Sequence, residues 1–558
     1  MNKKQLETAV LIVGAGPVGL TLAIDLAQQG VNVIVAETRR PRQVPTVRCN
    51  HISARSMEIF RRLGVAHKLR SAGLPANYPH DASFRTTVVG RELSRIPIPS
   101  RQDRLLAMHG AIDLDGPDSW WPTPEPPHRI NQLFLEPLLF DHTAAQQNLD
   151  LLNRTRIIGF EQNEQRVVAL AENLDSGEQF TIECQYLVGC DGGRSTIRKA
   201  MGANFVGDAV VQRVQSTYIR APKLLDMMPS GPAWAIVSLN PRRSGTLYAI
   251  DGRERWIVHN YLRPHETDFE AIDRDWSIRT ILGVDALGIA DFEYEVLANE
   301  DWIGRRLVAD RFRNQRVFIC GDAAHIWVPY GGYGMNAGIA DAANLAWLLA
   351  AHLNGWGSVH ILDAYERERL PITEQVSRFA MNYAAHMIKN RRIVPENIEE
   401  DSLAGKAIRA EFGQELYDLN VQQYCCGGLN FGYYYDDSPL IAYDGGQQPA
   451  YSMADFTPAT VPGCRTPHFW LANNQSLYDA LGSDYSLLRF DPTIPVAPLL
   501  DAAQQRRMPL TMLEIDPTLA PAAYTTKLLI SRPDQHVAWR GNAIPDNPSA
   551  LVAQLCGF

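Results

Sequence analysis

The chain has 558 residues, of which 46% are hydrophobic and 21% charged, and its formal net charge is -9. This composition is typical of a globular protein with a large core, and the length predicts three or four domain-sized units. The negative charge argues against nucleic acid as a partner, because nucleic acid attracts a basic face. The eight cysteines are scattered, without the spacing of a zinc site or a redox C-x-x-C pair, so we expect no metal.

The N-terminus runs into a predicted strand and not into the apolar core of a signal peptide. No uninterrupted apolar stretch is long enough to span a bilayer, so we expect no membrane partner. Both features predict a cytoplasmic protein. The cysteines are then interpreted as reduced, mostly buried thiols.

Residues 9–37 carry the clearest motif in the chain. An apolar run over 9–13 shows no alternation, as expected of a strand that is buried on both faces. A G-x-G-x-x-G follows at once, then apolar residues at helical spacing up to Gly30, and then a second apolar run over 31–36. The pattern predicts a complete βαβ unit. Its glycine-rich turn contains four residues that we assign to cofactor binding: Gly14, Gly16, Pro17 and Gly19.

Positions in this unit match what an adenine dinucleotide needs. Gly14 permits a tight turn, Gly16 lets the backbone approach a pyrophosphate at the helix N-terminus, and Gly19 lets the helix pack on the strand. Glu37 ends the second strand and is placed to accept hydrogen bonds from a ribose. The alternative is a loop that only turns the chain, but the position of Glu37 favours the dinucleotide. The basic loop that begins at Arg39 is expected to be a solvated turn.

Two further motifs indicate which dinucleotide is bound. A strand ending near residue 189 leads into C-D-G-G-R-S, and a strand over 317–320 leads into Gly321-Asp322 and a glycine-rich turn over 329–336. With the first motif, and in the same order, they resemble the single-component FAD-dependent aromatic hydroxylases of the para-hydroxybenzoate hydroxylase type. The resemblance extends over nearly the whole chain. It implies non-covalent FAD and the fold of that family.

The resemblance implies roles for residues outside the first motif. Arg48 would lie beside the FAD pyrophosphate and ribityl chain, Gln132 would touch the flavin, and Asp322 would hold the ribityl chain. Asp191 and Arg194 would support FAD and take part in nicotinamide binding. The alternative for these last two residues is a strand end with an aspartate cap.

The turn after Asp322 leads into a helix that apolar spacing predicts over 336–353. Backbone amides at a helix start supply positive potential, which the pyrimidine edge of a reduced flavin needs. The next helix begins near Leu362 and is expected to end at Pro371. The resemblance places four residues of the turn and helix start beside the flavin: Gly332, Gly334, Met335 and Asn336.

Short apolar runs between these motifs are typical of antiparallel strands. We expect a β-sheet substrate domain formed by 77–124 and 211–299, and in relatives such a sheet holds the aromatic ring. Each candidate for lining the pocket is also, taken singly, a residue that could belong to the core or the surface. The candidates are Tyr218, Arg220, Trp234, Tyr248 and His259.

Two further stretches are assigned to the pocket. The resemblance implies that the carbonyl of Pro329, followed by Tyr330, lies beside the reactive carbon of the substrate. Proline fixes φ and can present that carbonyl rigidly, while the alternative is a proline that merely breaks a strand. The proline-rich stretch over 100–128 has little periodicity. It predicts either a surface excursion packed by its own tryptophans or a cover over the pocket.

The predicted fold class is therefore α/β, with a Rossmann-like FAD-binding domain and a β-sheet substrate domain. The FAD-binding domain would comprise 1–76, 125–210 and 300–395, and a helical connector would follow over 396–445. Residues 446–558 resemble the thioredoxin-like domain of longer family members. This segment contains no C-x-x-C, so we expect no disulfide exchange and interpret it as structural or dimer-supporting.

The sequence shows one dinucleotide fingerprint, so NADH or NADPH would bind transiently and reduce the flavin. The resemblance implies that reduced flavin and molecular oxygen then form a flavin hydroperoxide, which hydroxylates a small aromatic, phenol-like substrate. Two alternatives stay open. One is Baeyer–Villiger insertion or epoxidation on a polycyclic, polyketide-like substrate, and the other is a non-catalytic flavoprotein that sequesters an aromatic ligand. We expect a homodimer.

Overall fold

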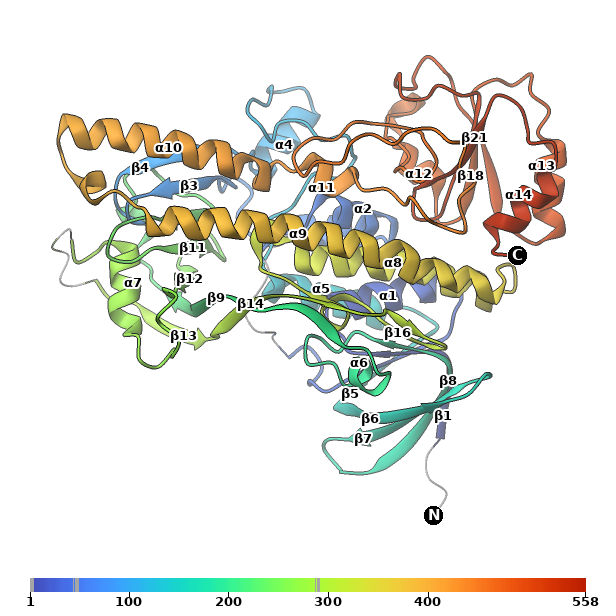
Figure 1. The fold of residues 1–558 in the computed structure, drawn as a ribbon, viewed down its shortest axis with the longest axis horizontal. Helices are drawn as coiled ribbons and strands as arrows, with labels where there is room; N and C mark the ends of the chain where they lie inside the picture. The colour runs from blue at the N-terminus through green and yellow to red at the C-terminus, as the bar shows by residue number, and fades with distance from the viewer. Residues whose placement is uncertain (1–4, 44, 46–49, 287, 289–291) are drawn as a thin grey trace.

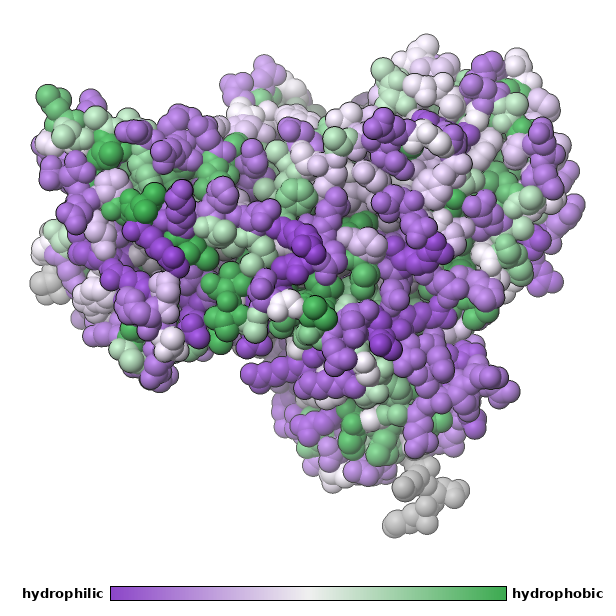
Figure 2. All heavy atoms as spheres, viewed as in Figure 1, coloured by the Kyte–Doolittle hydropathy of each residue, from purple (hydrophilic) through white to green (hydrophobic). Residues whose placement is uncertain are grey.

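The structure is a computed structural model that describes residues 5–43, 45, 50–286, 288 and 292–558. Two large sheets and one small sheet form its framework, and the chain ends in the small-sheet domain (Figure 1). The long helix α9 (Ala364–Arg392) runs across the middle of the molecule in this view. Polar and charged residues cover most of this face, with small groups of apolar residues between them (Figure 2).

The first sheet is mainly parallel, in the order β15-β16-β8-β1-β2-β5, with β7 and then β6 beside β8. Helices cover it, so its central strands are buried along most of their length, as parallel strands usually are. Its strands are β1 (Gln5–Val13), β2 (Val33–Glu37), β5 (Leu149–Asn153), β6 (Thr155–Gln162), β7 (Val167–Asn173), β8 (Gln179–Gly189), β15 (Arg313–Asn314) and β16 (Val317–Ile319). The helices near it are α1 (Pro17–Gln28), α2 (Ala54–Arg62), α3 (Ala66–Arg70), α5 (Gln132–Ala144), α6 (Thr196–Ala200) and α8 (Tyr333–Leu353).

The second sheet is mainly antiparallel, in the order β17-β14-β9-β12-β11-β10-β3-β4, with β13 beside β9. Its strands are β3 (Ala82–Arg85), β4 (Glu92–Ile96), β9 (Phe205–Arg220), β10 (Ala235–Ser238), β11 (Gly245–Ala249), β12 (Arg255–Tyr261), β13 (Glu295–Asn299), β14 (Trp302–Ala309) and β17 (His325–Ile326). The helices that contact it, besides α9, are α7 (Arg274–Leu282) and α10 (Leu403–Tyr424). α4 (Arg101–Met108) follows β4 in sequence, and α11 (Gly427–Phe431) contacts α2. In sequence, β3 and β4 precede strands β5 to β8 of the first sheet, and the other strands of the second sheet follow them.

The third sheet lies in the C-terminal domain and has the order β19-β18-β20-β21. β18 pairs in parallel with β19 and antiparallel with β20, which pairs antiparallel with β21. This arrangement, with one helix between the parallel strands and one after the last strand, is the thioredoxin-like topology predicted for this segment. The elements are α12 (Leu477–Leu481), β18 (Tyr485–Arg489), α13 (Ala497–Gln505), β19 (Leu510–Glu514), β20 (Leu528–Ser531), β21 (Val537–Gly541) and α14 (Pro548–Leu555).

The predicted α/β fold class and the βαβ unit are confirmed, but two local predictions are wrong. α9 does not end at Pro371 and continues to Arg392. Proline removes one helical hydrogen bond, and burial of side chains such as Ile372 and Val376 on the same helix offsets that loss. α8 begins at Tyr333, three residues earlier than predicted.

The stretch over 100–128 contains a helix, α4, which its prolines concealed. A capping box between Ser100 and Asp103 starts this helix, and that sequence signal was missed. Further along, the Trp121 indole donates to Asp118 at 3.1 Å and packs edge-on against Phe431 of α11. These contacts fit a segment packed by its own tryptophan, while a covering role for it stays a prediction.

Candidate active site

Three predicted motifs meet where β1, β8 and β16 end. The amide of Cys190, just after β8, donates to the carbonyl of Val13 in β1 at 2.8 Å. The amide of Cys320, just after β16, donates to the carbonyl of Gly189 at 3.0 Å. Segments that lie far apart in sequence therefore form one edge of the parallel sheet. Ligands of such sheets bind beyond the carboxyl ends of the strands.

The glycines of the first motif differ in what surrounds them. Gly14 has φ +107°, and a Cβ on it would lie 2.4 Å from the Cys190 carbonyl oxygen. A Cβ on Gly19 would lie 2.0 Å from the Gly14 carbonyl oxygen. A Cβ on Gly16 would meet no atom of the described residues within 4 Å. Gly16 is the N-cap of α1, and no side chain caps this helix start. The helix start therefore has open space beside Gly16, as a bound pyrophosphate requires.

Glu37 is the last residue of β2 and lies at the same edge of the sheet. Its carboxylate accepts hydrogen bonds from the amides of Ala15 at 2.8 Å and Arg39 at 2.9 Å. Burial alone would raise the pKa of Glu37, but the Arg39 guanidinium and these amides outweigh it and lower the pKa. Arg39 also donates to Glu136 at 2.7 Å, and Glu136 accepts from Gln132. Arg39 is therefore not the predicted solvated residue, because it links the positions assigned to ribose and flavin.

The other predicted FAD residues have different surroundings. Arg48 lies outside the described residues. Asp322 is exposed in the turn that follows β16. The Asp191 carboxylate accepts from the Ser195 hydroxyl at 2.5 Å and from the amide of Thr196 at 2.7 Å, at the start of α6. These contacts fit the alternative of an aspartate cap, and a cofactor role for Asp191 stays a prediction.

The buried side-chain amide of Asn336 connects the glycine-rich turn before α8 with the start of α2. Asn336 accepts from the amide of Ser53 at 2.9 Å and donates to the carbonyl of His51 at 3.2 Å, which joins the starts of α2 and α8. Gly332 has φ +68°, and a Cβ on it would lie 2.9 Å from the His51 ring. A Cβ on Gly334 would meet none of the described atoms within 4 Å. The start of α8, which has no side-chain cap, thus leaves space where a flavin edge is predicted.

The remaining predicted residues of this turn are Pro329, Tyr330 and Met335. The carbonyl of Pro329 accepts a hydrogen bond from the amide of Gly332 at 3.1 Å, and its ring is exposed. Tyr330 begins the short 3-10 helix Tyr330–Gly332. Met335 is half-buried on α8 and packs against the core of the first sheet. The predicted contact of the Pro329 carbonyl with a substrate stays a prediction.

Behind the turn after β16 lies a buried charged cluster that the sequence prediction missed. Asp341 of α8 accepts from the amide of Gly321 at 3.2 Å, from His325 Nε2 at 2.6 Å and from Arg369 Nε at 2.8 Å. Burial raises the pKa of Asp341, but His325 and Arg369 outweigh it and lower the pKa. The available signal was an aspartate inside an otherwise apolar helical run.

The register of the second sheet decides where the pocket candidates point. Residues directly opposite on antiparallel strands share a face. His259 lies opposite Thr246, Tyr248 lies opposite Ile257, and Ile257 lies opposite Tyr218. Because His259 and Ile257 are two residues apart, all three candidates are on one face. The intervening residues, including Trp256 and Val258, point to the other face and belong to the core that α7 covers.

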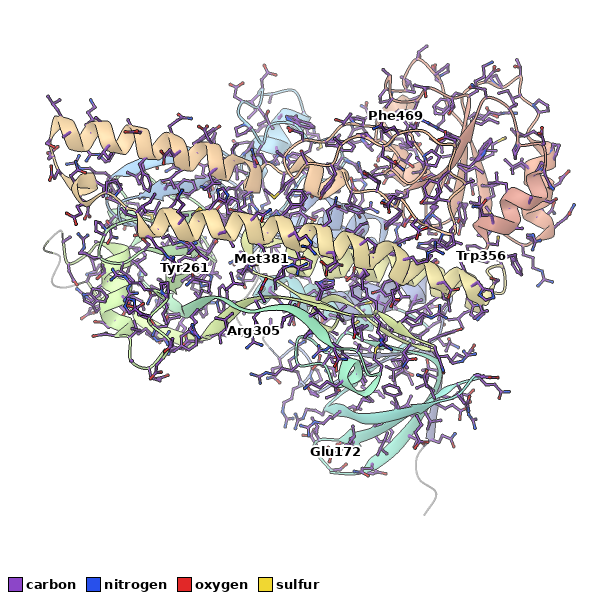
Figure 3. The ribbon with its side chains drawn as sticks, in the orientation of Figure 1. Glu172, Tyr261, Arg305, Trp356, Met381 and Phe469 are labelled. Atoms are coloured by element: carbon purple, nitrogen blue, oxygen red, sulfur yellow. The ribbon has the colours of Figure 1, made fainter. Side chains whose placement is uncertain are left out.

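The structure brings two of the three candidates together. The His259 ring lies 5.5 Å from Tyr248, 5.8 Å from Trp302 and 6.5 Å from Tyr261. Figure 3 shows Tyr261 on this sheet and Met381 on α9. Tyr218 is further along the same face and near Arg255.

Two other candidates are placed differently. Arg220 is exposed and paired with Glu254 at 2.9 Å, so it is not in this group. Trp234 packs 5.3 Å from Tyr248, and the guanidinium of Arg129 lies 4.0 Å from its ring. Arg129 was given no role from sequence. It also contacts His51 and so connects the second sheet with the turn before α8.

The residues around the sheet edge fit FAD. The open backbone at Gly16 and Gly334 and the carboxylate of Glu37 match pyrophosphate, flavin edge and ribose in that order. Within the described parts of the chain, no group of three or more His, Cys, Asp or Glu residues could hold a metal ion. In the same parts, no helix is long and apolar enough to cross a membrane.

Comparison with known proteins agrees with this geometry. Residues 7–380 match the family model described as FAD binding domain, and residues 459–557 match the model described as aromatic-ring hydroxylase, C-terminal. The chain belongs to the FAD-dependent aromatic-ring hydroxylases. The enzyme thus binds FAD and is a monooxygenase, as the sequence motifs predicted.

Several relatives of this enzyme share its full length. The tetracenomycin B2 monooxygenase-dioxygenase of Streptomyces olivaceus is 30% identical, over 98% of each chain. Among solved structures, the rebeccamycin biosynthetic enzyme RebC with reduced flavin has a TM-score of 0.88 and 32% identity over 99% of each chain. Aklavinone-11 hydroxylase with FAD and aklavinone has a TM-score of 0.80 and 25% identity over 100% of each chain.

Proposed function

We propose that this enzyme uses NADH or NADPH and molecular oxygen to hydroxylate a polycyclic aromatic substrate that carries a phenol-type hydroxyl. The proposal rests on the group of aromatic rings around His259 on one face of the second sheet. Solved relatives include RebC with bound 7-carboxy-K252c and aklavinone-11 hydroxylase in a ternary complex with FAD and aklavinone. The division into domains predicted from sequence belongs to this proposal, as does a homodimer.

Burial along β12 supports a binding face. Trp256, Ile257, Val258 and Asn260 are each 2% exposed or less. His259 is only half-buried, although its neighbours in the strand are almost completely covered. A half-buried ring on a covered strand is accessible to a ligand, and flat aromatic walls suit a flat aromatic ligand.

His259 supplies the polar contact in this group. Its Nδ1 atom is buried and has no hydrogen-bond partner among the described residues. Burial lowers the pKa of His259 to about 4, so the imidazole is neutral at pH 7. A neutral imidazole has one nitrogen that can accept a hydrogen bond from a phenol hydroxyl. His259 would therefore orient the ring without carrying a charge.

FAD, when bound, supplies the redox chemistry that activates oxygen. The protein holds and orients the reactants. Gly16 and the α8 start would hold the cofactor, and the second sheet would hold the substrate. The aromatic walls exclude water from the reacting ring, which favours oxygen transfer over release of hydrogen peroxide.

The test is a screen of NADH and NADPH oxidation by the FAD-loaded enzyme across phenolic acids and polycyclic phenols, with product analysis by mass spectrometry. We expect a polycyclic phenol to stimulate oxidation and to gain one oxygen atom as a ring hydroxyl. Stimulation without any oxygenated product for every compound would contradict hydroxylation. An epoxide or ring-inserted oxygen would favour the epoxidising or Baeyer–Villiger alternative.

A pair of variants tests the role of His259. We expect His259→Phe to keep its FAD and to bind the stimulating phenol about 10- to 100-fold more weakly, because one buried hydrogen bond is lost. His109→Phe is the control, since His109 is exposed just after α4. Equal affinity in both variants would remove His259 from the substrate site.

Stimulated by the same phenol, Pro329→Ser is expected to form less product for each NAD(P)H oxidised.

A further inference from the structure

A small cavity lies among α2, α8, α9 and α11. Its volume is about 30 Å³, which is more than the roughly 10–15 Å³ that a single water molecule needs. Arg55 lines it from α2, Arg369 and Thr373 line it from α9, and Trp327 lines it two residues before Pro329. A space of this size suits a small ion or water and is too small for a polycyclic aromatic substrate.

These four side chains share one property. Each has a buried polar atom without a hydrogen-bond partner among the described residues, although the side chains are only 7% exposed or less. Buried polar atoms without a partner are rare in proteins because they lose their bonds to water. Four of them around one cavity indicate a ligand in it. The atoms are Arg55 Nε, Trp327 Nε1, Arg369 Nη1 and Thr373 Oγ1.

The chemistry of these atoms selects the kind of ligand. Guanidinium and indole nitrogens donate hydrogen bonds and cannot accept them, and the Thr373 hydroxyl can donate as well. A water molecule would have to direct its own two hydrogens at acceptors. The amide oxygens in the lining are already engaged, since Asn336 accepts from Ser53 and Asn430 accepts from Arg55. The hydroxyl oxygens of Tyr333 and Tyr433, which also line the cavity, can accept, so the charge of the lining decides between water and an anion.

The charge of the lining favours an anion over water. The lining includes the two guanidinium groups of Arg55 and Arg369 and no carboxylate. The carboxylates that hold these arginines bind other atoms: Asp341 binds Arg369 Nε at 2.8 Å, and Glu58 binds Arg55 Nη1 at 3.1 Å. Each arginine is thus fixed by a carboxylate outside the cavity and keeps another nitrogen for the cavity itself.

We propose that this cavity binds a monatomic anion of the halide class, with chloride as the physiological ligand. The anion accepts hydrogen bonds from Arg55, Trp327, Arg369 and Thr373. It joins α2 and α9 to the segment that leads into the Pro329 turn. Arg55 also donates to the carbonyl of Asp534 at 2.7 Å, so the same site is connected to the C-terminal domain. The proposal does not depend on the substrate proposed above.

Crystals of the FAD-loaded enzyme grown in sodium bromide provide the direct test. Bromide scatters anomalously, whereas water does not. We expect an anomalous peak within the cavity, in contact with the four donors. Ordered density there without an anomalous peak would identify water and overturn the proposal. Peaks confined to the protein surface would overturn it as well.

Thermal unfolding in solution gives an independent measurement. A ligand that binds only the folded state raises the folded-to-unfolded ratio about 11-fold at ten times its Kd. We expect the Tm of the FAD-loaded enzyme to rise with sodium chloride more than with sodium gluconate at equal ionic strength. An equal rise in both salts would contradict a specific site.

Matched variants connect this rise with the cavity. Trp327→Phe and Thr373→Val each remove one donor, so we expect a smaller chloride-dependent rise in Tm. Trp347→Phe and Thr143→Val are the controls: Trp347 is buried on α8 outside this cavity, and the Thr143 hydroxyl bonds to the Leu139 carbonyl at 2.7 Å. If Trp327→Phe does not fold, Thr373→Val carries the comparison. The same rise in variants and controls would overturn the proposal.

Discussion

Arg532 of the C-terminal domain forms a fully buried ion pair with Glu368 of α9. The two guanidinium nitrogens lie 2.6 and 2.8 Å from the two carboxylate oxygens, and both side chains are 0% exposed. Arg532 also pairs with Asp534 at 2.7 Å. The C-terminal domain is therefore joined to α9 by a buried ion pair. If one partner is removed, the other charge stays buried away from water.

Removing one member of this pair should destabilise the enzyme strongly. We expect Arg532→Met to lower stability by about 3–5 kcal/mol, because Glu368 remains buried without its positively charged partner. Denaturant unfolding would measure the loss. Adding Glu368→Gln should recover part of it. Lys527→Met is the control, since Lys527 pairs with Asp491 at the surface, where such pairs contribute about 0–1 kcal/mol. Equal losses in Arg532→Met and Lys527→Met would contradict this account.

Two glycines of the same motif should respond differently to substitution. A side chain on Gly16 meets no described atom within 4 Å, so Gly16→Val should fold and lose FAD, which needs that space. A side chain on Gly19 meets the Gly14 carbonyl oxygen at 2.0 Å, so Gly19→Val should impair folding itself. The ratio of flavin to protein absorbance and the yield of folded protein separate the two effects. Full flavin content in Gly16→Val would contradict the assignment of Gly16 to the FAD site.

Asp341 should be required for the turn that carries Asp322. Asp341→Asn removes the charge that compensates Arg369, and it weakens the bonds to Gly321 and His325. We expect a loss of about 3–5 kcal/mol in stability and weaker FAD binding. Flavin release during thermal unfolding measures both. Asp363→Asn is the control, because Asp363 is about half exposed and pairs with Arg313. Unchanged FAD affinity in Asp341→Asn would contradict the link to the turn.

Acid should destabilise the enzyme through its buried histidines. Burial lowers the pKa of His128 and His468 to about 3 and that of His259 to about 4. The unfolded chain, with ordinary values near 6.5, therefore binds more protons than the folded chain between about pH 6.5 and 4. Stability rises with pH across that window and is lost as the pH falls. We expect Tm to drop from pH 7 to pH 5.

A histidine variant tests the source of this acid sensitivity. His128→Asn removes one depressed group, so its Tm should depend less on pH over the same window, even if it is lower throughout. His109→Asn is the control, because His109 is exposed. The comparison uses the slope of Tm against pH and not Tm itself. The same slope in both variants would contradict the role of burial.

Local sequence was sufficient for the dinucleotide unit. The glycine spacing, the apolar runs and Glu37 lie within 29 residues, and each feature constrains its own backbone or its neighbour's. That is why β1, α1 and β2 were predicted with their order and nearly with their bounds. The same reliance on local features explains the errors in the predicted helix bounds. A proline such as Pro371 is a strong local signal, but packing along α9 decided against it.

Which residues meet was decided by the tertiary structure. Arg532 and Glu368 are 164 residues apart, and neither stands in a local motif. The cavity donors come from three separate segments, and their lack of partners is a property of burial, which no spacing reveals. His259 was one of several polar residues on predicted strands, and only the register of β9, β11 and β12 placed it beside Tyr248. Sequence determines backbone preferences within a segment, whereas partners depend on how segments pack, because hydrogen bonds and ion pairs act over a few ångströms in space.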